Sequence, residues 1–227
     1  YIRTYGCQMN ELDTELMVGA LEKRGMTRVD DENLADLMLF NTCSIRDLAE
    51  RKVMGKLGKI GRSKKKNAII GITGCMAMAK KESLFRKIPH VDFVLGTNNI
   101  SDLSLVLDEV LTTGQQTLKT DDQFEENLNY LQAKRDDPLK AYVSIIRGCD
   151  KFCTYCVVPY TRGAEVSRSF AQVLDEAKAL VDAGAREITL LGQNVNAWED
   201  ADGRGLHDLD RKSTRLNSSH QIISYAV

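Results

Sequence analysis

The second half of the chain is organised around residues 141–156, which read AYVSIIRGCDKFCTYC. Residues 141–146 form an apolar, β-branched run typical of a buried strand, and Gly148 permits a tight turn after it. Cys149, Cys153 and Cys156 then follow with the spacing Cys-x3-Cys-x2-Cys. Cysteine thiolate is the usual ligand of iron–sulfur clusters, so three such thiols predict a four-iron cluster with one iron free of protein ligands.

The same cysteines have two other interpretations. Buried structural cysteines are common in protein cores, and cysteine also binds structural zinc. Three thiols within eight residues are dense for a core, however, and no histidine stands nearby to complete a zinc site. An iron–sulfur cluster is therefore the favoured interpretation.

The residues after these cysteines predict the rest of a βαβ unit. Ser169 and Gln172 have the spacing of a helix capping box, and residues 173–181 carry apolar side chains at helical spacing. Gly184 ends this helix, and residues 187–191 form the next apolar strand. Barrel enzymes place their active sites at the carboxyl ends of such strands. The sequence therefore predicts the first βαβ part of a truncated (β/α) barrel.

The first half of the chain alternates apolar runs with helical segments. The expected strands are residues 2–6, 37–40, 68–72 and 91–95, with a further short strand at 27–29. Asn10 is expected to be the N-cap of the first helix, and residues 100–111 form an amphipathic helix that closes this part. This alternation predicts an α/β domain with a doubly wound, mostly parallel sheet.

Three further cysteines each follow one of these strands directly. Cys7, Cys43 and Cys75 come after the first, second and third main apolar runs. The carboxyl ends of parallel strands form one edge of an open α/β sheet, so these thiols are expected to meet there. They could bind a second metal cluster or be ordinary buried thiols, and the cluster is the favoured interpretation.

Composition sets the broad class of protein. The chain has 227 residues, 43% hydrophobic and 28% charged, with a net charge of −1, which fits a globular protein and gives no overall signal for nucleic acid. No apolar run is long enough to span a membrane, and no signal peptide is visible, so a cytoplasmic location is expected. Because the chain starts at Tyr1, its native start is expected to be missing. The six cysteines favour metal or redox use over disulfides.

Changes in composition predict the domain organisation. Residues 1–114 form the first domain, the polar residues 115–138 a linker, and residues 139–209 the start of the barrel. Residues 210–227 lack a helical or strand period, resemble translated sequencing-adapter sequence, and are expected to be a non-native tail. Residues 51–66 are strongly basic and contain no acid; they form either a solvated helix face, the favoured interpretation, or a phosphate contact.

The cysteine motif, with Tyr155 just before its last cysteine, resembles that of the radical S-adenosylmethionine (SAM) enzymes. Five motifs within about residues 1–209 are similar to the methylthiotransferase family of that class: Thr4–Asn10, Asn41–Cys43, Thr73–Cys75, Gly148–Gly163 and Leu191–Asn196. The branch with most similar motifs adds a methylthio group to C2 of N6-isopentenyladenosine next to the anticodon in tRNA. The alternatives are a sister methylthiotransferase acting on ribosomal protein or on threonylcarbamoyladenosine, and a non-enzymatic iron–sulfur or zinc module for RNA binding or electron transfer.

The resemblance implies two 4Fe-4S clusters and SAM as cofactors. Cys149, Cys153 and Cys156 would hold the cluster that binds SAM, with Tyr155 close to the bound SAM or, alternatively, packed in the core. Cys7, Cys43 and Cys75 would hold an auxiliary cluster that carries or donates the inserted sulfur. One SAM would methylate that sulfur, and another would be cleaved to the radical that activates the adenine C2–H bond. The cofactors carry this chemistry, so no catalytic side chain is expected.

The resemblance also implies partners and a limit. The partners would be the anticodon loop of tRNA, where unstacked bases are accessible, and a reducing electron donor such as flavodoxin. A monomer is expected. In the family the barrel continues for several strands and is followed by an RNA-binding TRAM domain, so the 227-residue chain alone is expected to be inactive on tRNA.

Overall fold

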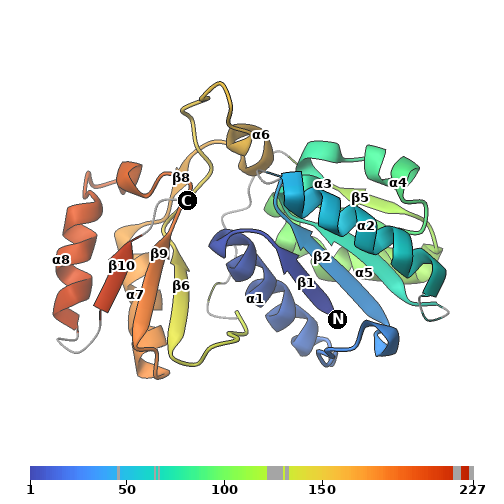
Figure 1. Ribbon diagram of the computed structural model, residues 1–227. Helices are drawn as coiled ribbons and strands as arrows, with labels where there is room; N and C mark the ends of the chain where they lie inside the picture. The colour runs from blue at the N-terminus through green and yellow to red at the C-terminus, as the bar shows by residue number, and fades with distance from the viewer. Residues whose placement is uncertain are drawn as a thin grey trace. The chain divides into compact units, whose positions relative to one another are not determined.

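The computed structural model describes residues 1–44, 47–63, 65, 67–121, 130, 133–216 and 221–224. The chain divides into two compact units. The first consists of Tyr1–Leu128 together with Tyr160–Arg162, and the second of Asn129–Pro159 together with Gly163–Val227. Each unit has its own parallel sheet and its own apolar core (Figure 1).

The first unit contains a five-stranded sheet in which every neighbouring pair is parallel. Its strands lie in chain order: β1 (Ile2–Tyr5), β2 (Leu37–Thr42), β3 (Ile69–Thr73), β4 (Phe93–Leu95) and β5 (Thr117–Lys119). The predicted parallel sheet is thus confirmed. The fifth strand is β5, which lies within the predicted linker 115–138, whereas the expected strand at 27–29 is absent and those residues are irregular.

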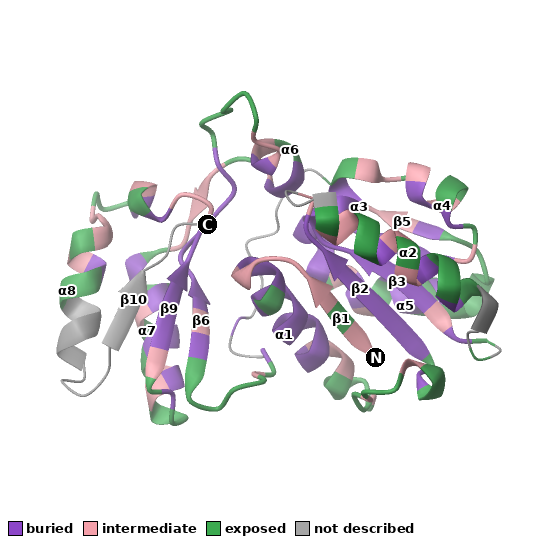
Figure 2. Cartoon of the chain, viewed as in Figure 1, coloured by how far each residue is buried: buried purple, intermediate pink, exposed green. Residues whose placement is uncertain are grey.

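Helices cover both faces of this sheet. They are α1 (Gln8–Lys23), η1 (Glu32–Leu34), α2 (Asp47–Ser63), α3 (Cys75–Lys80), α4 (Ser83–Lys87), η2 (Thr97–Asp102) and α5 (Leu103–Thr113). Met38 and Phe40 of β2 pack in one core cluster with residues of α2, α3 and α4. Because α1 and α5 contact each other and add nothing to that cluster, they cover the opposite face. All six residues of β2 are buried between the two layers (Figure 2).

The start of α1 differs from the prediction. Cys7, rather than Asn10, is the N-cap residue, and it makes no side-chain capping hydrogen bond. Asn10 lies in the first turn of the helix and is fully buried. Its amide is used in a tertiary hydrogen-bond network, described below, because a buried amide needs partners.

The second unit contains a three-stranded parallel sheet with the order β10-β9-β6. Its elements are β6 (Lys140–Ser144), β7 (Ile146–Arg147), β8 (Val166–Ser167), α7 (Phe170–Asp182), β9 (Glu187–Leu191), η4 (Val195–Ala197), α8 (Leu206–Leu216) and β10 (Gln221–Ser224). The short helix α6 (Val158–Arg162) has its last three residues in the first unit. The predicted βαβ unit is β6-α7-β9, and its strands pair in parallel.

The predicted capping box of α7 is present. The Ser169 hydroxyl accepts a hydrogen bond from the Gln172 backbone N–H, and the Gln172 side chain accepts one from the Ser169 N–H. Val173, Ala177 and Leu180 are buried in the core of this unit, as the apolar spacing predicted. The capping box fixes where α7 begins, and the buried apolar residues fix which face of the helix packs on the core.

Regular secondary structure is present after residue 209, within the segment predicted to be a non-native tail. Helix α8 continues to Leu216, and β10 pairs in parallel with β9, so the unit has three strands in its sheet rather than the predicted two. The alternation of strand and helix thus continues beyond the predicted end of the barrel segment. No helix in the described part of the chain is both long and apolar enough to cross a membrane.

Candidate functional site

The loop that carries Cys149, Cys153 and Cys156 is closed at its base by backbone contacts. Strands β7 and β8 pair antiparallel there, and the Cys149 N–H donates to the Gly163 carbonyl over 3.2 Å. Gly148 has φ +74°, and its N–H donates to Oε1 of Gln193 over 2.6 Å. A Cβ at residue 148 would lie 1.9 Å from the Ala164 carbonyl oxygen, so only glycine fits this position.

The three thiols of this loop differ in exposure. Cys149 is buried, Cys156 is half-buried and Cys153 is exposed. A turn joins the last two, since the Cys156 N–H donates to the Cys153 carbonyl over 2.8 Å. Tyr155 is 93% exposed, which excludes the alternative of a packed core tyrosine. The loop therefore presents its cysteines at or near the surface of the second unit, where a cofactor can reach them.

The other three cysteines lie at the carboxyl ends of three adjacent strands in the first unit. The register pairs Tyr5 with Thr42, and Asn41 with Thr73, so β1, β2 and β3 end side by side. Cys7, Cys43 and Cys75 follow within two residues of those ends. Adjacent strands are roughly 4.8 Å apart, so the three backbone positions share one edge of the sheet. Cys43 and Cys75 are buried and Cys7 is half-buried.

A buried network of amide groups joins these cysteine-bearing loops. Asn10 Nδ2 donates to Asn41 Oδ1 over 2.8 Å, and Asn41 Nδ2 donates to the Asn10 carbonyl over 2.8 Å. The Cys7 thiol donates to Asn10 Oδ1 over 3.3 Å. Gly74 packs on the same network, because a Cβ there would lie 2.4 Å from Asn41 Oδ1. Asn41 thus sets the spacing of the loops that carry Cys7 and Cys75.

A buried ion pair also belongs to the first unit. Nη2 of Arg162, in α6, lies 2.7 Å from Oδ2 of Asp13 in α1, and both side chains are only 2% exposed. Burial disfavours the cation, but electrostatic interactions with Asp13, Cys75 and Cys7 and the hydrogen bond to Asp13 outweigh this cost. The pKa of Arg162 is therefore raised above its ordinary value, and the guanidinium stays charged.

No three His, Cys, Asp or Glu side chains in the described residues converge on a point that could hold a single metal ion. A four-iron cluster makes a different demand, because each thiolate binds a different iron atom. The donor set at each site consists of thiols alone, which suits iron–sulfur chemistry rather than a mixed zinc or magnesium site.

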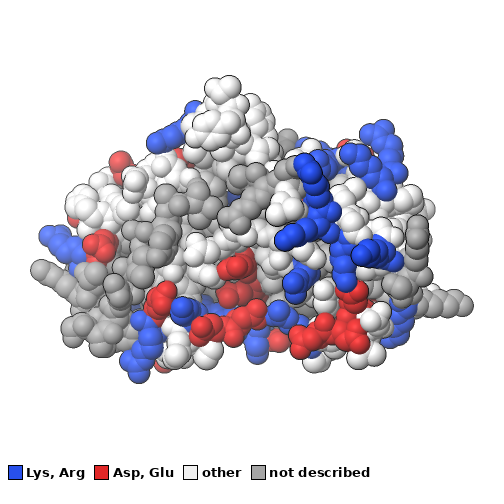
Figure 3. All heavy atoms as spheres, viewed as in Figure 1, with Lys and Arg blue, Asp and Glu red and all other residues white. Residues whose placement is uncertain are grey.

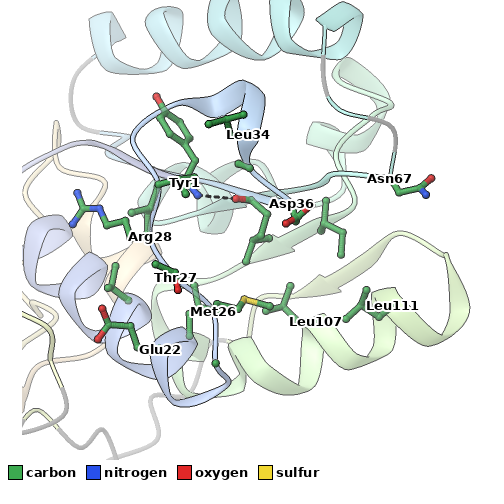
Figure 4. Close-up of a pocket in the computed structure, with 18 residues that line it drawn as sticks. Tyr1, Glu22, Met26, Thr27, Arg28, Leu34, Asp36, Asn67, Leu107 and Leu111 are labelled. Atoms are coloured by element: carbon green, nitrogen blue, oxygen red, sulfur yellow. Dashed lines mark hydrogen bonds between the residues drawn. The ribbon is translucent and has the colours of Figure 1, made fainter.

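A cavity of the first unit lies away from the cysteines. It has a volume of about 520 Å³ and is lined mainly by residues at the amino ends of β1, β2 and β3 and by α1 and α5 (Figure 4). Tyr1, Leu37 and Ile69 line it, whereas none of the six cysteines does. The thiols follow the opposite, carboxyl ends of the same strands, so the cavity is separate from the candidate site.

Lys and Arg side chains gather over α2 on the first unit (Figure 3). Several of them already have acidic partners. Lys56 pairs with Glu32 over 2.5 Å, and Lys80 of α3 pairs with Glu50 over 2.9 Å. Lys65, at the end of the predicted basic run, pairs with Asp36 over 2.5 Å. These pairs agree with a solvated, ion-paired helix face; residues 64 and 66 of the run lie outside the described residues.

Two families match the two parts of the chain. Residues 1–96 match the uncharacterized protein family UPF0004, and residues 143–223 match the radical SAM superfamily. The solved structures that resemble the chain include a radical SAM methyltransferase, TsrM from Kitasatospora setae, with cobalamin and a [4Fe-4S] cluster bound. The TM-score is 0.57 at 15% identity, over 92% of this chain and 50% of that one, a likeness of fold alone. The chain therefore contains a region that matches the UPF0004 family, followed by a region that matches the radical SAM superfamily.

Within this class, the chain is similar to curated proteins named tRNA-2-methylthio-N(6)-dimethylallyladenosine synthase. The one from Protochlamydia amoebophila is 70% identical over 198 residues, which cover 87% of this chain and 44% of that protein. The one from Dictyoglomus thermophilum is 43% identical over 212 residues, which cover 92% of this chain and 47% of that protein. The chain thus spans about half the length of the curated relatives it matches.

Sequence reasoning missed the residues that support the cysteines. Asn41 and Arg162 stand inside motifs that resemble the family, but neither was assigned a role. Their partners are distant: Asn10 is 31 positions from Asn41, and Asp13 is 149 positions from Arg162. The signal available at Asn41 was a polar amide at the end of an apolar run, because a buried amide must find a hydrogen-bond partner.

Proposed function

We propose that the protein is a radical SAM methylthiotransferase that adds a methylthio group to C2 of N6-isopentenyladenosine, next to the anticodon in tRNA. The observation that carries this proposal is that each of the two regions matched to a family carries three cysteines. One set lies in the radical SAM domain, and the other at the strand ends of the UPF0004 domain. The 70% identity to a curated synthase of this kind supports the substrate.

In this proposal Cys149, Cys153 and Cys156 hold the cluster that binds SAM, and Tyr155 contacts the bound SAM. The closed base of the loop supports the assignment, since Gly148 and Gln193 fix the backbone before the first thiol. The exposed Tyr155 side chain is available to a ligand. When bound and reduced, this cluster supplies the electron that cleaves SAM.

Cys7, Cys43 and Cys75 hold the second 4Fe-4S cluster in the same proposal, which makes two clusters in total. Their position at one sheet edge supports it, as does the Asn10–Asn41 pair, which fixes the spacing between the loops. The chain's own contribution is to hold the sulfur ligands rigidly and to keep the site largely buried.

The partners follow from the proposed reaction. The macromolecular substrate is tRNA, read at the unstacked bases of its anticodon loop. A low-potential protein such as flavodoxin supplies the electrons, and the enzyme acts as a monomer in the cytoplasm. The names of the curated relatives support the tRNA part of this proposal.

Anaerobic reconstitution tests the two cluster assignments. The chain should bind about eight iron atoms, and about four should remain after Ala replacement of either cysteine set. Only the variant that keeps Cys149, Cys153 and Cys156 should convert SAM to 5′-deoxyadenosine. A zinc content near one with no iron would instead identify a structural metal module.

The nucleoside assignment needs a separate test. In a strain that lacks the full-length gene, mass spectrometry of tRNA nucleosides should show loss of 2-methylthio-N6-isopentenyladenosine. The full-length gene should restore it, and its Cys7→Ala variant should not. Persistence of that nucleoside in the deleted strain would contradict the assigned substrate, and loss of methylthiolated threonylcarbamoyladenosine instead would identify the sister enzyme.

A further inference from the structure

Arg162 is a deeply buried, ion-paired cation of the first unit. Its side chain is 2% exposed and its Nη2 pairs with Asp13, in the second turn of the helix that starts after Cys7. The segment is held in place by Thr97, whose hydroxyl donates to the Thr161 carbonyl over 2.6 Å. The guanidinium is therefore fixed in position rather than free to move.

One nitrogen of this guanidinium lacks a hydrogen-bond partner among the described residues. Nη1 of Arg162 is buried without a hydrogen-bond acceptor in the described part of the chain. Buried N–H groups almost always have partners, so an unused donor indicates an absent ligand. Besides Asp13, Cys75 and Cys7 are the groups whose electrostatic interaction raises the pKa of this guanidinium. The unused donor thus belongs to the neighbourhood of the proposed second cluster.

We infer that Arg162 supplies a fixed positive charge and an N–H donor to a sulfur atom at the site of Cys7, Cys43 and Cys75, and so raises the reduction potential of the cluster bound there. This inference rests on the proposed function. The potentials of iron–sulfur clusters depend on net charge and on hydrogen bonds to sulfur.

The sign follows from electrostatics. One-electron reduction makes the cluster more negative, so a nearby cation stabilises the reduced form more than the oxidised form. The Asp13 carboxylate has the opposite effect, because it repels the added electron and neutralises part of the guanidinium charge. Asp13 and Arg162 should therefore move the potential in opposite directions, although loss of either one breaks the same ion pair.

The test uses the full chain with Cys149, Cys153 and Cys156 replaced by Ala, so that a single cluster is observed. After anaerobic reconstitution, the cluster is titrated electrochemically and followed by electron paramagnetic resonance. Arg162→Gln should lower the reduction potential by at least about 59 mV, which is a tenfold decrease in the equilibrium constant for one-electron reduction. Asp13→Asn should raise it, and Arg162→Lys should stay near the unsubstituted value.

Arg168→Gln is the matched control. It also breaks an ion pair that is mostly buried, with Glu176 at 2.5 Å, but in the second unit. It should leave the potential unchanged. If Arg162→Gln fails to fold, Asp13→Asn/Arg162→Gln leaves no unpaired buried charge, and its potential should fall below that of Asp13→Asn alone.

The outcomes separate the two proposals. If no four-iron cluster assembles while Arg162 is intact, the assignment of Cys7, Cys43 and Cys75 fails. If the cluster assembles but Arg162→Gln and Asp13→Asn leave its potential unchanged, or shift it in the same direction, the role of Arg162 is overturned and the ion pair is structural only.

Discussion

Asn41 lies at the centre of the polar contacts between the loops that carry Cys7, Cys43 and Cys75. Its side chain bonds Asn10 twice and also donates to the Thr14 hydroxyl over 3.0 Å. Asn41→Ala would leave the buried Asn10 amide without its acceptor. We expect it to lower the free energy of unfolding by about 1–3 kcal/mol, measured by urea denaturation of the iron-free protein.

The control for this prediction is Asn33→Ala, since Asn33 is exposed and bonds only to nearby Asp31. That change should cost less than about 0.5 kcal/mol. Equal losses in the two variants would show that the Asn10–Asn41 network does not stabilise the first unit.

Gly148 offers a second prediction at the same scale. Gly148→Ala would put a methyl group against the Ala164 carbonyl and would also strain a backbone with φ +74°. We expect the loop that carries Cys149, Cys153 and Cys156 to be displaced from the position in which it binds iron. Bound iron should then fall to about half, and SAM cleavage should be lost. Iron analysis and 5′-deoxyadenosine release measure the two effects.

Gly203→Ala is its matched control. Gly203 has nearly the same φ, +76°, but a Cβ there would meet nothing within 4 Å. It shares the backbone strain without the clash, so its iron content should stay unchanged. Similar iron loss in both variants would assign the effect to backbone strain alone.

At the scale of elements, the N-terminus of α7 is fixed by its capping box. Ser169→Ala removes the acceptor for the Gln172 N–H and should lower the stability of the second unit by about 1 kcal/mol. Lys178→Ala, on the same helix, breaks only an exposed pair with Asp175 and should cost less. Thermal unfolding followed by circular dichroism compares them; equal midpoints would contradict a role for the cap.

Glu176, on the buried face of α7, predicts a pH dependence. Burial raises the pKa of Glu176, and the nearby Arg168 only partly opposes this. The folded state therefore binds the proton more tightly than the unfolded state. The free energy of unfolding should fall as pH rises from about 4.3, the ordinary pKa of glutamate, through the raised folded pKa.

Glu176→Gln should remove this slope. The free energy of unfolding of both chains is measured with urea at several pH values between 4 and 7. As pH rises, the free energy of unfolding of the variant should increase relative to that of the unsubstituted chain. Parallel curves would mean that Glu176 has the same pKa in both states.

The elements themselves were predictable where the signal was local. The runs at β1 to β4, and the helix α7 with its cap, are visible because apolar period and capping residues depend on neighbours in sequence. Strand β5 is three residues long with only Thr117 buried, and it exists because it pairs with the edge of β4. Helix α8 lies in a strongly polar segment, in which its few apolar contacts, such as Leu209, carry the packing.

The candidate site divides in the same way. The six cysteines were identified from spacing and from strand ends. The Arg162–Asp13 pair was not, because its partners are 149 positions apart and only the folded chain brings them together.

At the scale of the whole molecule, the clusters should stabilise the fold. A ligand that binds only the folded state adds to the free energy of unfolding by mass action. Removal of iron with a chelator, under anaerobic conditions, should therefore lower the thermal midpoint of the reconstituted chain to that of the iron-free chain. The change is followed by circular dichroism and by the visible absorbance of the clusters.

Ala replacement of one cysteine set should remove only part of this stabilisation. The remaining iron should be lost in a single transition when the unit that holds it unfolds. If chelation leaves the thermal midpoint unchanged, the metal does not contribute to the stability of either unit.

The strand order of the first sheet has a consequence for biosynthesis. Because β1, β2 and β3 lie in chain order, each can pair with a neighbour that left the ribosome shortly before it. The part of the sheet that presents Cys7, Cys43 and Cys75 is thus translated well before Cys149 is reached. The proposed cluster at this edge can therefore receive iron on the nascent polypeptide while the rest of the chain is still being made.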